Sequence, residues 1–395
     1  MTNILQAALP RSRRFCCKGR RFYYIIIVRP RPPETGGKVK KNIAISLLLL
    51  PLCAAPALSA GGQAVRAFPD FAVSSGPVPL AQQLSTGAVV GRGGNYALAL
   101  PGGGTLWLLN DIWIGETGPA GDAVWGIVEG AAALAESTAP FSQRAVKYSL
   151  DENGWPLPLF GPDGGAYSQV RKYRPRAAAA AGGKYYVFYS ILNNYGPDLY
   201  DYFRVGQGLA EADRPEGPYS RSTAAPAGFW NDLEPAFGSA VLDGGDGWLY
   251  VYGRAMNAPG EYGAALARVK PEGLADPAAY AYYSEGPDGG SWTADVSEAS
   301  EVFEDAPEEF SVTDNAFLGG FLLVYSDPDT GSALARTAAY PWGPWSEPVT
   351  LVACAAGDYC SGAKEQGAFA AAGGRRIYLT IEKKNAPYLY EITFK

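Results

Sequence analysis

The sequence predicts an all-β protein, a five-bladed β-propeller with antiparallel four-stranded blades around a central channel. Three observations predict this fold. Gly (49) and Pro (31) are plentiful while charged residues make up only 18% of the chain, as is typical of many short strands and tight turns. Five short apolar runs, each led by glycine, recur along the chain. Two later turns repeat the same Gly-Pro-aromatic-Ser pattern, which indicates an internal repeat.

The apolar runs lie at residues 103–111, 183–190, 247–254, 320–327 and 374–382. Aromatic and β-branched residues concentrated over so short a length favour strand over helix. Because the runs are almost continuously apolar, we expect strands that are buried on both faces and that form the inner walls of the blades. Successive runs start roughly 55–80 residues apart, which is the length of one four-stranded blade with its loops.

The repeated turns lie at residues 217–220 and 343–346. Each follows a strand-like segment that comes after one of the apolar runs. We interpret them as equivalent turns of one repeated unit, in which Gly-Pro ends the strand and the aromatic residue packs back on the sheet. A β-sandwich of similar length would not repeat a unit five times, so the repeat favours the propeller.

The N-terminal region differs in character from the rest. Residues 39–60 have two lysines, an apolar core and small residues at the end, which is the pattern of a secretory signal peptide. Residues 1–38 do not suit the start of such a signal, and we interpret them as a mis-assigned start or a disordered extension. Residues 61–84 form a lead-in and 85–395 the propeller. We expect a secreted or periplasmic protein without a stable membrane span, and Cys53 lacks the small preceding residue that lipid anchoring needs.

The charge distribution excludes some partners. Residues 1–60 carry 11 of the 33 Lys and Arg but only one of the 39 Asp and Glu, so the remainder has 22 basic and 38 acidic residues and a net charge of −16. So acidic a protein repels phosphate backbones, which argues against nucleic acid and disfavours strongly anionic polysaccharides.

The types of residue present limit the chemistry. The chain has no histidine, which excludes histidine-containing catalytic triads, histidine-ligated metals and imidazole acid–base catalysis. After residue 60 the only cysteines are Cys354 and Cys360. We predict that they form a disulfide in an oxidising compartment, since a metal site would need further soft ligands. The acidic turns at 243–247 and 327–331 lack the spacing of a calcium-binding loop, and we expect hairpin turns there.

Four segments carry a family resemblance. They are LWLLNDIWIGE (106–116), FGSAVLDGGDGWLYVYG (237–253), FSVTDNAFLGGFLLVYS (310–326) and LARTAAYPWGPWSEP (334–348). Together they resemble the domain of unknown function 4185 family, over most of residues 85–395. The resemblance implies a five-bladed propeller related to glycoside hydrolases of families 43 and 117 and similar to endo-D-arabinanases. Two positions depart from the family pattern, because Gly93 replaces an aspartate and Gln366 replaces a histidine.

Glycoside hydrolysis needs two carboxyl groups, one as proton donor and one as base or nucleophile. The candidate catalytic residues are Asp111, Glu234 and Glu309. Asp111 ends the first apolar run and matches an aspartate of the family motif; the alternative is a carboxylate that caps a strand end. Glu234 has aromatic neighbours in sequence that could raise its pKa by desolvation, and its alternative is a solvated loop acid.

Further residues are candidates for binding sugar. Aromatic faces can stack on sugar rings, amides and carboxylates can bind hydroxyls, and an arginine can do the same; the alternatives are core packing, an Asx turn and a surface loop. These candidates are Trp113, Trp230, Tyr173, Asn315, Asp314, Asp232 and Arg176.

The sequence is compatible with three functions. The first is a monomeric glycoside hydrolase without cofactor or metal, acting on a neutral oligo- or polysaccharide such as an arabinan or arabinogalactan. The second is a propeller that binds glycans without cleaving them, which the departures at Gly93 and Gln366 motivate. The third is a cell-surface scaffold whose acidic faces dock another protein.

Overall fold

The computed structural model describes residues 67–395, with gaps at 75–77, 81, 84–87, 119–120, 141–142, 144–145, 162–169, 199–200, 223–227, 288 and 385. The predicted extension, the signal segment and Cys53 lie outside the described residues. Across the described part of the chain, no helix combines the length and hydrophobicity needed to span a membrane. The short 3₁₀ helices include η2 (Pro271–Gly273), η3 (Pro277–Ala279), η4 (Val296–Glu298) and η5 (Gly367–Phe369).

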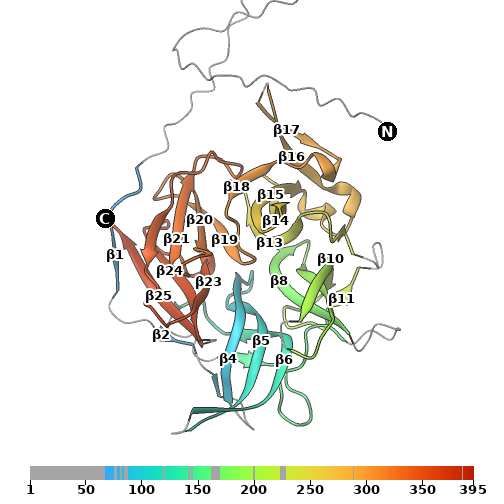
Figure 1. The fold of residues 1–395 in the computed structure, drawn as a ribbon, viewed down its shortest axis with the longest axis vertical. Coiled ribbons are helices and arrows are strands. Elements are labelled where there is room, and N and C mark those ends of the chain that lie inside the picture. Colours follow the sequence, from blue (N-terminus) through green and yellow to red (C-terminus); the bar gives the residue numbers. More distant parts are fainter. Residues whose placement is uncertain are drawn as a thin grey trace, which may run out of the picture. The chain divides into compact units, whose positions relative to one another are not determined.

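Five antiparallel sheets form a ring (Figure 1). Blade I contains β3 (Gln82–Gln83), β4 (Ala88–Ala99), β5 (Thr105–Gly118), β6 (Gly121–Ala135) and β7 (Lys147–Tyr148). Blade II contains β8 (Arg171–Ala181), β9 (Lys184–Asn194), β10 (Tyr202–Ala212), β11 (Ser220–Arg221) and β12 (Trp230–Asn231). Blade III contains β13 (Ala236–Asp243), β14 (Leu249–Ala258), β15 (Glu261–Val269), β16 (Ala281–Gly286), β17 (Gly289–Thr293) and β18 (Glu301–Glu304).

The last two sheets complete the ring. Blade IV contains β19 (Phe310–Asn315), β20 (Gly320–Ser326), β21 (Ala333–Ala338) and β22 (Val349–Val352). Blade V contains β23 (Cys360–Glu365), β24 (Arg376–Lys383), β25 (Ala386–Phe394), β1 (Phe71–Val73) and β2 (Val78–Pro79). The predicted all-β, five-bladed propeller is therefore confirmed. Part of the predicted lead-in belongs to the ring, because β1 pairs with β25 as the outermost strand of blade V.

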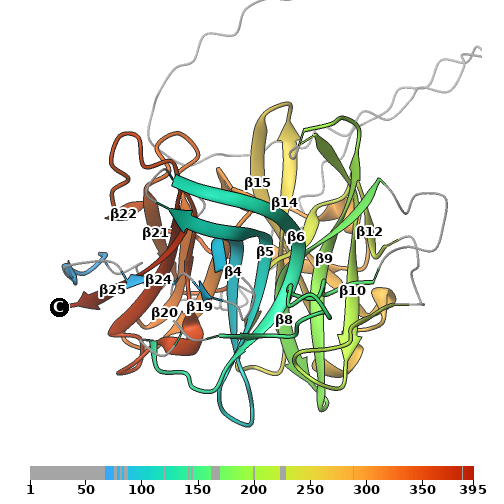
Figure 2. The same cartoon turned by 90° about the horizontal axis from the view of Figure 1, so that it is seen from below.

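The innermost strands are not the glycine-led apolar runs. Contacts connect β4 to β8, β8 to β13, β13 to β19, β19 to β23 and β23 back to β4, so these five strands surround the axis. Seen from the side, they run along it (Figure 2). The apolar runs form β5, β9, β14, β20 and β24, the second strand of each blade. The prediction that they form the inner walls is wrong.

The reason lies in how neighbouring blades pack. On β5, Leu106 and Leu108 face a core shared with blade II, while Trp107 and Leu109 face a core shared with blade V. The other second strands alternate in the same way between two cores. A second strand has a neighbouring blade on each face, so its side chains are mainly apolar on both. An innermost strand borders the channel and carries polar side chains there.

The two repeated turns share one geometry. Gly217 and Gly343 have φ of 90° and 95°, and each amide donates to the carbonyl three residues earlier at 3.0 Å. Only glycine adopts such a φ without cost. Tyr219 is buried in the core between blades I and II, and Trp345 packs on the core between blades III and IV. The predicted equivalence of the turns and the inward packing of their aromatic residues are confirmed.

Candidate active site

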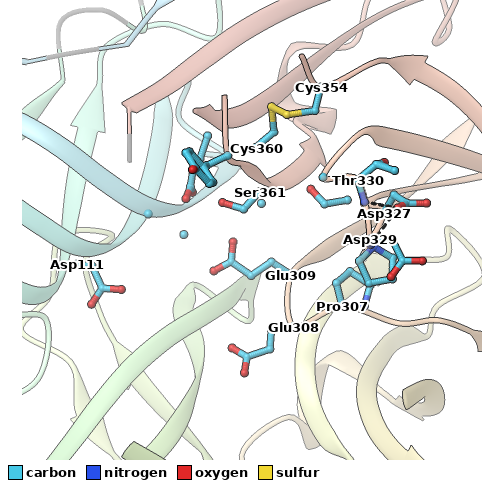
Figure 3. A pocket seen from close by; sticks show the side chains of 18 of the residues that line it. Asp111, Pro307, Glu308, Glu309, Asp327, Asp329, Thr330, Cys354, Cys360 and Ser361 are labelled. Carbon is cyan, nitrogen blue, oxygen red and sulfur yellow. Dashed lines mark hydrogen bonds between the residues drawn. A yellow bond between two sulfur atoms is a disulfide. The ribbon is translucent and has the colours of Figure 1, made fainter. Parts of the chain in front are cut away.

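A cavity of about 760 Å³ opens at one mouth of the central channel. Its walls come from four blades: they include Gly93 on β4, Asp111 on β5, Arg174 on β8, Glu309 just before β19, and Glu382 on β24. The carboxylate of Asp111, on β5, and those of Glu308 and Glu309, in the loop before β19, enter it (Figure 3). The size suits a few sugar units.

Asp111 is fixed by an arginine from the next blade. Its backbone has a φ of 42°, which an aspartate tolerates better than most residues. Both carboxylate oxygens lie 3.2 Å from Arg174 Nη2. Burial raises the pKa of Asp111, the guanidinium of Arg174 opposes this rise, and the carboxylates of Glu129 and Glu309 add to it. Arg174 also contacts Glu129 at 3.6 Å, so one buried cation serves two acids.

Glu308 and Glu309 enter the cavity side by side but have different partners. Arg176 Nη2 donates to Glu308 at 3.1 Å, and this arginine is the main cause of the lowered pKa of Glu308. Glu309 forms an ion pair with Lys364, whose side chain is only 3% exposed. A buried cation is costly without an anion nearby, and the Glu309 carboxylate is the partner of Lys364.

Glu382 is the carboxyl group best suited to carry a proton. Burial, and then the neighbouring Glu309 carboxylate, raise its pKa to about 7, against the opposing effects of Lys364 and Asn95. Asn95 Nδ2 donates to Glu382 Oε1 at 2.9 Å. A Cβ placed on Gly362 would lie 3.0 Å from Glu382 Oε1 and 3.2 Å from Glu309 Oε2. The two oxygens are therefore within roughly 6 Å, close enough for carboxyl groups to cooperate in glycoside hydrolysis.

The sequence patterns did not indicate four residues of this site: Glu382, Glu308, Arg174 and Lys364. A signal for Glu382 existed, because it ends the fifth apolar run as Asp111 ends the first. Nothing local in the sequence distinguishes the buried cations from surface ones. Within the described residues, no group of three or more Cys, Asp or Glu is arranged to hold a metal ion.

Sequence comparison places this fold in a family. Residues 168–390, more than half of the 395-residue chain, match the family described as a domain of unknown function, DUF4185. The chain belongs to the DUF4185 family. The resemblance seen in its sequence motifs is thereby confirmed. No curated protein matches the chain in sequence.

Solved structures are similar to this DUF4185 protein over most of its length. A protein of Bacteroides ovatus, provisionally named a hydrolase, superposes with a TM-score of 0.60 at 17% identity, covering 76% of this chain and 85% of that chain. A family 117 glycoside hydrolase from Zobellia galactanivorans gives 0.48 at 13% identity, covering 82% and 91%. A GH43_1 enzyme from Xanthomonas citri gives 0.44 at 17% identity, covering 80% and 90%. The first of these shows a shared fold, and the reaction has to be argued from the site.

Two of the three predicted catalytic residues of the DUF4185 protein, Asp111 and Glu309, line the cavity. Glu234 does not. Its Oε2 accepts a hydrogen bond from the amide of Asn231 at 2.7 Å, so it closes the turn before β13. Asp232, in the same turn, is exposed, and its carbonyl accepts from Arg204 at 2.8 Å. The structure gives both acids a local role in this turn.

The predicted aromatic platforms are not at the cavity. Trp230 is 2% exposed and donates from Nε1 to the Tyr282 hydroxyl at 2.9 Å, so the prediction for it is wrong: it fills the core between blades II and III. Tyr173 packs against Tyr189, with the Arg221 guanidinium 4.2 Å from its ring centre, which also contradicts a platform. Trp113 is partly buried on β5 and does not line the cavity.

The predicted hydroxyl ligands are also elsewhere. Asn315 ends β19, whereas Glu309 precedes its start, so the two lie at opposite ends of the channel. Asn315 is 1% exposed, its Oδ1 accepts from the Leu318 amide at 3.0 Å, and its Nδ2 donates to the Gly374 carbonyl at 3.0 Å. Its role is therefore the Asx turn, and the sugar-ligand prediction is wrong. Asp314 lines a smaller cavity of about 350 Å³ at that other end.

Arg176 is a buried strand residue. The surface-loop alternative is wrong, because its side chain is 8% exposed, and hydroxyl binding by Arg176 stays a prediction. Its Nε donates to Ser190 Oγ at 2.8 Å while its guanidinium holds Glu308. The acidic turns are hairpin turns as expected: Asp327 Oδ1 accepts from the amides of Asp329 and Thr330 (Figure 3).

The predicted disulfide between Cys354 and Cys360 is present and borders the cavity. The departure at Gln366 has a structural explanation. Gln366 is buried, its Oε1 accepts from the Ala97 amide at 2.9 Å, and its Nε2 donates to the Asn95 carbonyl and Thr380 Oγ1. This side chain therefore joins blade V to blade I behind the cavity.

Proposed function

We propose that this DUF4185 protein hydrolyses glycosidic bonds of a neutral glycan at the cavity, with Glu382 as the proton donor and Asp111 as the second carboxylate. The observation that carries the proposal is the raised pKa of Glu382, with Glu309 ion-paired to Lys364 beside it and an arginine-held Asp111 in the same cavity. Enzymes use such environments to keep one carboxyl group protonated and another ionised at the same pH.

The carboxyl groups of the cavity supply both the acid and the base that the proposed hydrolysis needs. Glu382 donates its proton to the glycosidic oxygen as the bond to the anomeric carbon breaks. Asp111 either removes a proton from the attacking water, which inverts the configuration, or attacks the anomeric carbon itself. In the second case water, giving a proton to Glu382, then displaces Asp111 from the sugar, which retains the configuration overall. The Glu309 carboxylate, which pairs with Lys364, raises the pKa of Glu382 and so favours the proton there. A negatively charged sugar would be repelled by these acids, which favours a neutral substrate.

The test is reducing-end release from a panel of neutral polysaccharides, including arabinan and arabinogalactan because of the family resemblance. We expect Glu382→Gln and Asp111→Asn each to lower turnover by at least about a hundredfold, the usual contribution of general acid–base catalysis. Glu234→Gln is the matched control and should keep full activity. Normal turnover in both cavity variants would remove these residues from the mechanism, and NMR of the first product anomer would assign the stereochemistry.

Glycan binding without cleavage is the second candidate. The observation that favours it is Gly93, which lies beside the Glu382 carboxylate where the family pattern has an aspartate: a Cβ there would be 3.6 Å from Glu382 Oε2. Saturable binding to a panel polysaccharide with no product after prolonged incubation would support this function over hydrolysis.

We also propose that the chain is exported before it acts. The disulfide between Cys354 and Cys360 supports this, since such bonds persist in oxidising compartments and are rare in the cytosol. Fractionation of cells that express the full chain, with sequencing of the N-terminus of the mature protein, tests both export and cleavage within 39–60.

A further inference from the structure

One wall of the cavity is the loop closed by the disulfide, residues 354–360. Five of its seven positions are Cys, Ala or Gly, and all of its residues except Asp358 line the cavity. Tyr359 is the one large residue of the loop, and it is 81% exposed. Among the described residues that line the cavity, it is the one aromatic side chain.

The loop is attached at three points. The disulfide joins its two ends, Lys383 Nζ contacts Asp358 Oδ2 at 3.1 Å, and the Cys354 amide donates to Ser332 Oγ at 3.1 Å. Lys383 follows Glu382 directly in the chain. The position of the loop is therefore tied to the strand that carries the proposed proton donor.

The backbone of Tyr359 is unusual. Its φ is 49°, in the left-handed region that a bulky aromatic residue adopts only at a cost. A conformation of this kind persists where the surroundings impose it, and it is concentrated at ligand-binding sites. Here the short disulfide loop imposes it and presents a large, exposed ring that no core contact requires.

We propose that Tyr359 is a substrate-binding residue that stacks on a sugar ring at the mouth of the cavity, next to the bond that is cleaved. This inference rests on the proposed function and names one of its binding contacts. A tyrosine suits the task, because it offers a rigid apolar face and a hydroxyl at little cost in conformational entropy. Exposed apolar surface beside a polar cavity is typical of a ligand-binding position.

The experiment compares Tyr359→Ala, Tyr359→Phe and Tyr195→Ala on arabino-, galacto- and xylo-oligosaccharides. Tyr195 is the matched control, since it is 67% exposed but does not line the cavity. We expect Tyr359→Ala to raise KM by about tenfold with kcat nearly unchanged, Tyr359→Phe to stay within about threefold of the wild type, and Tyr195→Ala to have no effect. Circular dichroism spectra verify that each variant is folded.

Two further measurements separate the possible failures. Isothermal titration with the cleaved oligosaccharide in a Glu382→Gln background should show the same loss of affinity for Tyr359→Ala. The double variant Cys354→Ser/Cys360→Ser should also raise KM, because the loop that positions Tyr359 is released. An active wild type with unchanged KM in Tyr359→Ala overturns this inference alone, whereas a wild type that neither binds nor cleaves any oligosaccharide overturns the proposed function and this inference with it.

Discussion

Three carboxyl groups of one cavity differ because of their partners. Asp111 has a guanidinium on both oxygens, Glu309 has a buried ammonium group, and Glu382 has only an amide donor. Burial raises the pKa of both Asp111 and Glu382, and that of Glu382 rises to about 7. A cation beside a carboxyl group offsets the cost of its charge, and an amide offsets less of it.

The pH profile of activity should report Glu382. A proton donor is active only while protonated, so kcat/KM should fall as the pH rises through about 7. Asn95→Gly removes the hydrogen bond that lowers the pKa of Glu382, and glycine accepts the φ of 42° at this position. The alkaline limb should therefore move to higher pH in this variant. A limb that stays in place would show that another group sets it.

Gly362 keeps the space between Glu309 and Glu382 open. Its φ is 61°, and an added Cβ would meet both carboxylates within 3.2 Å. Gly362→Ala should therefore reduce kcat/KM by at least about tenfold. Gly373→Ala is the control, because its φ of 66° imposes similar backbone strain but its nearest neighbour is 3.8 Å away. Equal effects of the two variants on activity and thermal stability would mean that strain, and not the carboxylates, explains the loss.

The second strand of each blade could be recognised from the sequence, whereas the innermost strands that line the channel could not. The second strands are recognisable because cores lie on both of their faces, as Leu106 and Trp107 show. The innermost strand β8 reads RKYRPRAAAAA, whose arginines look like surface residues until a ring of blades buries them. Charge buried by tertiary structure leaves no local pattern.

The fold also explains which of the predicted site residues lie at the cavity. Asp111 ends an apolar run of the repeat and Glu309 directly precedes β19, and the structure places both at the cavity. Trp230 and Asn315 are residue types that suit sugar binding, yet an indole can also fill a core and an amide can also close a turn. Residue type indicates what a side chain can bind, and only the fold decides what it meets.

A substitution of Gln366 tests the contact between blade V and blade I, which contain β23 and β4. Gln366 makes two hydrogen bonds to blade I and a third, to Thr380, within blade V, so Gln366→Leu should leave the Ala97 amide and the Asn95 carbonyl without partners. Each unpaired buried group costs about 1–3 kcal/mol, and we expect a loss of about 2–4 kcal/mol in the free energy of unfolding. Thr380→Val, which removes one of the three bonds, is the graded control in urea denaturation. A larger loss in Thr380→Val than in Gln366→Leu would contradict this assignment.

The whole ring depends on contacts between the two ends of the described chain. The C-terminal strand β25 is held on its outer edge by β1, with Phe71 opposite Phe394 in register. Phe68 also reaches this cluster, its ring centre 5.7 Å from that of Phe394. Every blade packs on two neighbours, so weakening one blade removes support from both adjacent cores. We therefore expect loss of this contact to lower the stability of the ring as a unit.

Phe68→Ala with Phe71→Ala tests this directly. Both rings are partly buried against the core of blades IV and V, so we expect the double variant to lose about 2–5 kcal/mol, below the value for two fully buried rings. Val73→Ala on the same strand is the control, since that side chain is 40% exposed and should cost little. Differential scanning calorimetry should show one transition at lower temperature, because the blades share their cores. A separate early transition with an unchanged main peak would mean that blade V unfolds alone and that β1 closes only its own sheet.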